Sequence, residues 1–152
     1  MTINFPKKIC VLCSAWRETF RMPGFKKMVV HLLNPVDSTR YTEFAYLLCF
    51  FGERLKGLKI LDVSSPHVLS YMLSRHNNVV KTNIDEAESC LIRESENLEF
   101  HREDALALTF PDETFDLTYS ISVVEHIYLK YTNAVREMLR VTKDGGYVYL
   151  TF

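Results

Sequence analysis

Residues 58–67 constrain the fold of this chain more than any other stretch. They begin with a short apolar run, which favours a strand because it is rich in aliphatic residues and too short for a helix. Asp62 lies near the end of this run, a polar turn over 64–66 stops it, and residues compatible with a helix follow over 68–75. A strand, a tight turn and a helix in this order open a βαβ unit. A ligand of such a unit binds in the crevice beyond the carboxyl end of the strand, which here is beside Asp62.

The same alternation of strands and helices continues to the end of the chain. Further strands are expected over 79–84, 98–101, 115–120 and 147–152, and helices over 86–93 and 133–141. This alternation predicts an α/β fold with a Rossmann-like, doubly wound, mostly parallel sheet. We expect a single domain in which residues 57–152 form the core. Residues 1–56, with a helix over 39–55, are predicted to be a helical N-terminal extension.

The composition is that of an ordinary globular domain, with 152 residues of which 47% are hydrophobic and 24% charged. The net charge of -1 argues against nucleic acid as a partner, because phosphate binding needs a surplus of Lys and Arg. No apolar run reaches the ~20 residues that span a membrane, and no signal-peptide pattern opens the chain. These features predict a cytoplasmic protein without a membrane partner.

Cys10 and Cys13 form a C-x-x-C near the start of the sequence. A zinc site would need a second such pair or a matching pair of histidines, and the sequence has neither. The apolar residues around the two thiols indicate instead that they are buried. No metal site is therefore expected.

Three segments of the second half carry a family signature. Residues 104–116 read D-A-L-A-L-T-F-P-D-E-T-F-D, residues 120–127 read S-I-S-V-V-E-H-I, and residues 136–146 read R-E-M-L-R-V-T-K-D-G-G. They resemble the D-A-x-x-L-P-F-P-D-x-S-F-D, S-x-x-V-L-E-H-I and E-x-x-R-V-L-K-P-G-G motifs of class I S-adenosylmethionine-dependent methyltransferases, in particular the branch that includes quinone-biosynthesis methyltransferases. The resemblance covers residues 58–152. It implies S-adenosylmethionine as cofactor and methyl transfer to a small-molecule acceptor that the sequence does not identify.

The chain departs from this family in the turn after the first strand. Family members have D-x-G-x-G-x-G there, whereas residues 62–67 read D-V-S-S-P-H. Glycines let the backbone approach a cofactor and adopt a positive φ, which Ser, Pro and His do at a higher cost. The alternative is therefore a non-catalytic module that binds S-adenosylmethionine or S-adenosylhomocysteine. A nicotinamide-dependent oxidoreductase is disfavoured, because the sequence lacks G-x-G-x-x-G.

The resemblance implies cofactor-binding residues at the strand ends. Asp62 would face the amino group of the methionine moiety. Asp85 would accept hydrogen bonds from the ribose hydroxyls, with a helix N-cap as the alternative role. Asp104 would accept from the adenine amine with Ala105 beside the ring, unless it is a solvated loop carboxylate. The full expected set is Asp62, Ser64, Ser65, Asp85, Asp104, Ala105 and Ser120.

No catalytic residue is assigned. Glu125 and His126 have the chemistry of a general base, but family members with different substrates carry the same pair, so the resemblance makes them mainly structural.

Family members continue after the fifth strand with a helix and two more strands, and the chain is expected to be truncated at that point. Residues 147–152 are then an apolar, uncharged strand at the edge of the sheet. Such an edge tends to recruit another strand. We expect a homodimer through this edge or cover by a further C-terminal segment, with the N-terminal runs 8–13 or 28–33 as the alternative cover.

Overall fold

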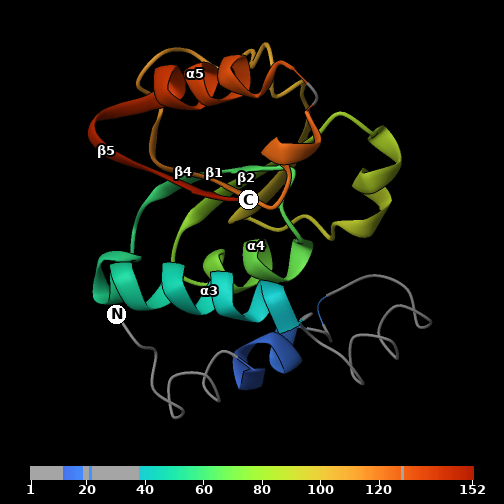
Figure 1. Ribbon diagram of the computed structural model, residues 1–152. Coiled ribbons are helices and arrows are strands. Elements are labelled where there is room, and N and C mark those ends of the chain that lie inside the picture. Colours follow the sequence, from blue (N-terminus) through green and yellow to red (C-terminus); the bar gives the residue numbers. More distant parts are fainter. Residues whose placement is uncertain (1–11, 19–20, 22–37, 128) are drawn as a thin grey trace.

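The computed structural model describes residues 12–18, 21, 38–127 and 129–152 and has an α/β architecture (Figure 1). Its strands are β1 (Lys59–Val63), β2 (Asn78–Asn83), β3 (Leu98–Arg102), β4 (Phe115–Ile121) and β5 (Thr142–Thr151). Its α-helices are α3 (Ser38–Phe51), α4 (His67–Leu73) and α5 (Tyr131–Val141), and residues 12–18 are also helical. Short 3-10 helices are η1 (Gly52–Arg54), η2 (Glu86–Leu91) and η3 (Val124–His126).

The five strands form one sheet in the order β3-β2-β1-β4-β5, and all four pairings are parallel. The first strand in the sequence, β1, lies in the centre of the sheet. The chain then moves outward through β2 and β3 and returns to the other side of β1 with β4 and β5. This is the doubly wound arrangement that the sequence predicts. The direction of winding reverses between β1 and β4, which is where ligands of such sheets bind.

Helices cover both faces of the sheet, as Figure 1 shows: α5 lies above it, and α3 and α4 lie below it. Successive side chains of a strand point to opposite faces, so each strand contributes to both cores. Ile60 of β1 belongs to the core between the sheet and the helices α3 and α4, whereas Leu61 belongs to the core between the sheet and α5. Asp62 follows in this alternation and therefore points toward α4.

The N-terminal part packs on the α4 side. The α3 helix ends at Phe51, earlier than predicted, because Gly52 has a φ of +53°, outside the helical region. The carboxylate of Glu18, the last of the helical residues 12–18, is buried and pairs with Arg21 at 2.8 Å and with Arg75. These ion pairs connect the first helical segment to the end of α4.

The structure differs from two predictions, at Cys13 and at the start of β5. Cys13 is an exposed free thiol, so the prediction of a buried thiol is wrong there, and Cys10 lies outside the described residues. The start of β5 is also different, because the predicted turn over 143–146 is a bulge inside the strand. The strand pairing shifts from Phe115↔Thr142 to Leu117↔Tyr147 across it.

The predicted alternative cover for β5, residues 8–13 or 28–33, lies almost wholly outside the described residues. Within the described sheet β5 is an edge strand, as predicted, and pairs with β4 alone. Of the helices that the structure describes, none is both long and apolar enough to span a membrane.

Candidate functional site

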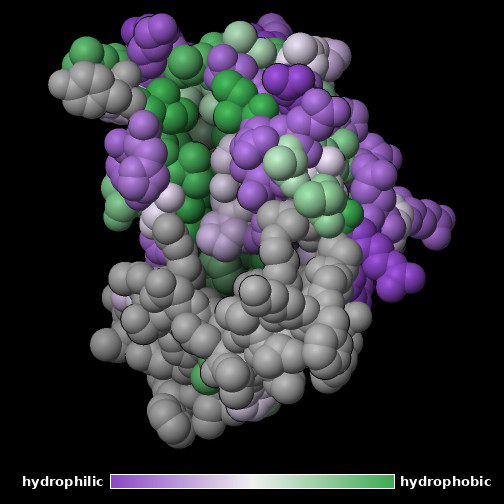
Figure 2. Space-filling view, turned by 90° about the vertical axis from the view of Figure 1, so that its right-hand side faces the viewer, coloured by the Kyte–Doolittle hydropathy of each residue, from purple (hydrophilic) through white to green (hydrophobic). Residues whose placement is uncertain are grey.

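The candidate site lies at the carboxyl ends of β1, β2, β3 and β4. Parallel strands all end at the same edge of the sheet, so the turns and acidic residues that follow them come together there. Figure 2 faces this edge and shows a band of apolar atoms between two groups of hydrophilic side chains.

Asp62 is the centre of a buried polar network under this edge. Its Oδ1 accepts a hydrogen bond from the Ser65 amide at 2.9 Å. Its Oδ2 has three donors, the Tyr119 hydroxyl at 2.8 Å, the Lys81 ammonium at 3.1 Å and the Ser70 hydroxyl. Neither Asp62 nor Lys81 is exposed to solvent. Both carboxylate oxygens are thus bonded inside the protein.

Tyr119 is held in its neutral, donating form. Burial, and after it the Asp62 carboxylate, raises the pKa of the Tyr119 hydroxyl well above its usual value near 10. A buried ion pair is stable only when its remaining lone pairs and protons are satisfied. The Tyr119 and Ser70 hydroxyls meet this requirement for Asp62.

The turn after β1 is built without glycine. Ser64 has a φ of +59°, in the left-handed region that favours glycine, and its amide donates to the Thr82 carbonyl at 3.0 Å. Ser65 is buried, its hydroxyl accepts from the Ile121 amide at 2.9 Å, and its carbonyl accepts from Lys81. The turn is therefore bonded to β2 on one side and to β4 on the other.

Ser120 supports the same turn from β4. It is fully buried, and its hydroxyl donates to the Val63 carbonyl at 3.0 Å. Its side chain thus joins the ends of the two central strands.

Asp85 follows β2 and is exposed. Its Oδ1 accepts from the Ala87 amide at 2.9 Å and caps η2, which is the alternative that the sequence left open. Among the described residues the second oxygen, Oδ2, accepts no hydrogen bond. The cap therefore leaves one carboxylate oxygen at the strand end for a ligand hydroxyl.

Asp104 follows β3 and is also exposed. Its Oδ1 accepts from the Leu106 amide at 2.9 Å, which fixes the turn that contains Ala105. The Ala105 side chain packs partly against the core under α5. The neighbouring Glu103 points the other way and is buried, with its carboxylate bonded to Thr109.

A contact between His67 and Glu88 joins the turn after β1 to the segment after β2. The His67 ring, at the start of α4, lies 2.8 Å from the Glu88 carboxylate in η2. This contact crosses the region between Asp62 and Asp85, so the two strand ends are fixed relative to each other.

Arg140 of α5 fixes the loop between β3 and β4. Its guanidinium donates to the carbonyls of Leu108 and Phe110, both at 2.8 Å, and to the Asp112 carboxylate at 2.7 Å. It also makes a two-pronged pair with Glu137, at 2.7 and 2.9 Å, and the Glu137 carboxylate accepts from the Leu108 amide. Two of the sequence motifs are therefore parts of one structural unit.

Three residues of this network, Lys81, Tyr119 and Ser70, were not among those predicted from the sequence. Lys81 is the one charged residue in β2, whose other members are apolar or neutral. A lone Lys in a strand expected to be central was a signal that an acidic partner lies nearby, since buried charges are paired. Tyr119 and Ser70 carried no comparable signal, because such residues are common in cores and helices.

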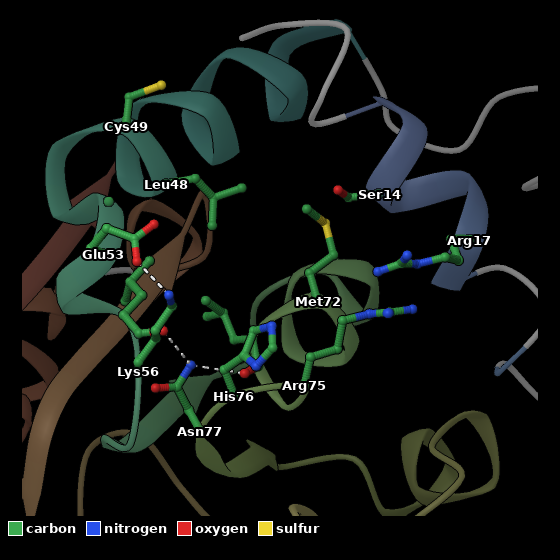
Figure 3. A pocket seen from close by; sticks show the side chains of 13 residues that line it. Ser14, Arg17, Leu48, Cys49, Glu53, Lys56, Met72, Arg75, His76 and Asn77 are labelled. Atoms are coloured by element: carbon green, nitrogen blue, oxygen red, sulfur yellow. Dashed lines mark hydrogen bonds and ion pairs between the residues drawn. The ribbon is translucent and has the colours of Figure 1, made fainter.

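The cavity in Figure 3, of about 650 Å³, lies elsewhere. It is bordered by α3, by α4 and by the helical residues 12–18, with Leu48, Met72 and Arg17 among its lining. Lys56 and Asn77, which also line it, precede β1 and β2. It is therefore near the amino ends of the strands, away from Asp62, Asp85 and Asp104.

A parallel sheet of this order with an acid at each of its first three strand ends defines a Rossmann-like fold of the class I methyltransferase type. Residues 62–150, more than half of the chain, match the family model described as "Methyltransferase domain". The chain belongs to this family of class I S-adenosylmethionine-dependent methyltransferases.

Two curated relatives and one solved structure illustrate the similarity. The chain is 32% identical over 104 residues to phthiotriol/phenolphthiotriol dimycocerosates methyltransferase 1 of Mycobacterium ulcerans, which covers 64% of this chain and 38% of that protein. It is 31% identical over 122 residues to an uncharacterised protein of Methanocaldococcus jannaschii, which covers 80% of this chain and 52% of that one. A solved structure from Pyrococcus horikoshii has a TM-score of 0.60 and 28% identity, over 76% of this chain and 59% of that chain. The chain thus spans about two fifths to one half of the length of these curated relatives.

Proposed function

We propose that this chain binds S-adenosylmethionine across the carboxyl ends of β1, β2 and β3 and transfers its methyl group to a small-molecule acceptor. The family match supports methyl transfer in general. The observation that carries the proposal is the pair of exposed strand-end carboxylates, Asp85 and Asp104, each with only one oxygen bonded among the described residues. In this proposal residues 1–56 extend the single domain whose core is 57–152.

Within the site, each predicted residue has a distinct proposed role. Asp85 accepts from the ribose hydroxyls through Oδ2, and Asp104 accepts from the adenine amine, with Ala105 beside the ring. These roles agree with the exposure of both acids. Four further members of the predicted set, Asp62, Ser64, Ser65 and Ser120, act by fixing the turn beside the methionine end.

The bound cofactor would supply an electrophilic methyl group on its sulfonium. The chain's own contribution is to bind and orient the two reactants in line and to exclude water. A general base is not needed for this role. Glu125 and His126 are both exposed, and the His126 ring nitrogen lies 3.9 Å from the Glu125 carboxylate, which is consistent with a structural pair.

Calorimetric titration with S-adenosylmethionine, S-adenosylhomocysteine and NAD tests the proposal. We expect both adenosyl compounds to bind and NAD not to bind. The Asp85→Ala variant should bind S-adenosylhomocysteine roughly tenfold to a hundredfold more weakly, since a carboxylate bonded to two hydroxyls contributes a few kcal/mol.

Asp144→Ala is the matched control. Asp144 is an exposed acid near the amino end of β5, whereas the proposed site lies at the carboxyl ends of the strands. It should leave the affinity unchanged. An equal affinity of wild type and Asp85→Ala for S-adenosylhomocysteine would contradict the role of Asp85 in binding the ribose. An absence of binding to wild type at millimolar ligand would contradict the cofactor itself.

The second candidate function is a non-catalytic module that binds the same cofactor. The glycine-free turn with its strained Ser64 favours it. Incubation with S-adenosylmethionine labelled in the methyl group and a metabolite extract separates the two. Labelled small molecules support the enzyme, whereas binding without labelled product supports the module.

We also propose self-association through the edge of β5, which has a free side in the described sheet. A cytoplasmic location stays a prediction from the sequence.

A further inference from the structure

The polar groups of the turn after β1 already form hydrogen bonds with other groups of the protein. The amide, hydroxyl and carbonyl of Ser65 are each bonded, to Asp62, Ile121 and Lys81. The Ser120 hydroxyl is bonded to a carbonyl of β1. These are the groups next to the place where the amino-acid half of an adenosyl cofactor would lie.

The charge of Asp62 is also neutralised. Lys81 lies 3.1 Å from Oδ2, and both side chains are closed off from solvent. A ligand ammonium that used Asp62 would have to displace the Lys81 cation from a site closed off from solvent. Two like charges beside one buried carboxylate cost more than they gain, because the second ammonium must lose its hydration.

The turn offers little to a ligand carboxylate either. Pro66 is the N-cap residue of α4 and has no amide hydrogen, and α4 has only seven residues. A helix this short has a weak dipole at its amino end. By contrast, the acids at the ends of β2 and β3 are exposed.

We propose that this site recognises its ligand through the adenosine half and that the amino-acid half adds little to the affinity. Lys81 is the residue responsible, because it occupies the carboxylate that would otherwise pair with the ligand ammonium. The ligand class is therefore 5′-thioadenosines in general, including 5′-methylthioadenosine. This inference rests on the proposed function and makes it more specific.

Titration of the full chain with S-adenosylhomocysteine and 5′-methylthioadenosine tests the proposal, since the two differ in the amino-acid half. We expect dissociation constants within fivefold of each other, and a deamino analogue of S-adenosylhomocysteine should fall in the same range. Binding of S-adenosylhomocysteine more than fivefold tighter than 5′-methylthioadenosine overturns the inference and leaves the proposed function standing. If neither compound binds at millimolar concentration, both the inference and the proposed function are contradicted.

Two variants test the cause. Lys81→Met frees Asp62, so it should increase the preference for S-adenosylhomocysteine over 5′-methylthioadenosine by about tenfold. Asp85→Ala removes a contact to the shared ribose, so it should weaken both ligands by the same factor. A folded Lys81→Met variant with an unchanged preference overturns the role of Lys81. If this variant does not fold, the dissociation constants of the wild-type chain for the three ligands still decide the inference.

Discussion

Ser64 shows at the scale of one residue how the chain manages without the family's glycines. Its φ of +59° costs a non-glycine residue about 1–2 kcal/mol relative to ordinary backbone. Its amide is bonded to the carbonyl of Thr82, and the next residue is anchored by three bonds. The strain persists because the neighbours of Ser64 determine its conformation.

Replacing Ser64 by glycine should relieve this strain. The gain is partly offset by the greater freedom of glycine in the unfolded chain, so we expect Ser64→Gly to raise the free energy of unfolding by up to about 1 kcal/mol. Urea denaturation measures it. Ser89→Gly, at an exposed serine without a positive φ, is the control and should lower stability. A loss of stability in Ser64→Gly as large as in the control would contradict the account.

Tyr71, Tyr119 and Tyr149 give the protein a dependence on alkaline pH, because burial raises the pKa of each of them. Burial, and then the Glu43 carboxylate, raises the pKa of Tyr149 to about 12. The pKa of Tyr119 is raised for the reason given above. In the unfolded chain tyrosines ionise near pH 10, so unfolding releases protons above that pH. The stabilisation from Tyr149 is complete below pH ~10 and is lost as the pH rises through about 12. The stabilisation from Tyr71 and Tyr119 is likewise complete below pH ~10 and falls at higher pH.

Urea denaturation at intervals from pH 9 to pH 12 should show this fall in the free energy of unfolding. The Tyr149→Phe variant removes one of the three groups, so its curve should fall less steeply over the same range. A variant curve parallel to that of wild type would mean that Tyr149 ionises equally in both states.

At the scale of elements, Arg140 is the main support of the loop between β3 and β4. Arg140→Met keeps most of the aliphatic stem but removes bonds to two carbonyls and two carboxylates. We expect a loss of roughly 2–3 kcal/mol in the free energy of unfolding, since the guanidinium is partly exposed and its bonds are charge-assisted.

Arg136→Met on the same helix is the matched control. Arg136 is exposed and its described side-chain bond is to Asn133 at 3.2 Å, so this variant should change stability by less than about 0.5 kcal/mol. Equal effects of the two substitutions in urea denaturation would show that the loop does not depend on Arg140.

Strand positions were largely predictable from the sequence where a short apolar run is bounded by turn residues. β2 is an example, predicted over 79–84 and found as Asn78–Asn83. The segment after it was predicted to be a short helix over 86–93 and is the 3-10 helix η2, Glu86–Leu91. The acids that end β1, β2 and β3 were also predictable in position.

The bonds of Asp62 were not predictable. The partners of Asp62 include Tyr119, 57 positions away along the chain, and only the folded sheet brings them together. Lys81 points to the same carboxylate because residues paired across parallel strands share a face, and Asp62 is in register with Lys81. That register is a tertiary property.

At the scale of the whole molecule, the side of β5 that pairs with no other described strand predicts self-association. The strand is uncharged over 147–152, and its Val148 and Leu150 side chains are half-buried on the α5 side. Val148→Lys or Leu150→Lys should therefore disrupt the assembly, because a charge at an edge opposes strand pairing.

Light scattering over a range of concentrations measures the effect. Tyr131→Lys is the control, since Tyr131 is an exposed residue at the start of α5 and outside β5. A wild type that stays monomeric at high concentration would exclude pairing between copies.

The order of the strands also has a consequence for a chain that is still being synthesised. Asp62 meets Ser65, Ser70 and Lys81 within 3, 8 and 19 positions, but Tyr119 only after 57. Closing the longer loop costs more entropy and takes longer. A nascent chain that has not yet reached β4 therefore presents the central strand with one side unpaired, and during that interval this side is open to pairing with another chain.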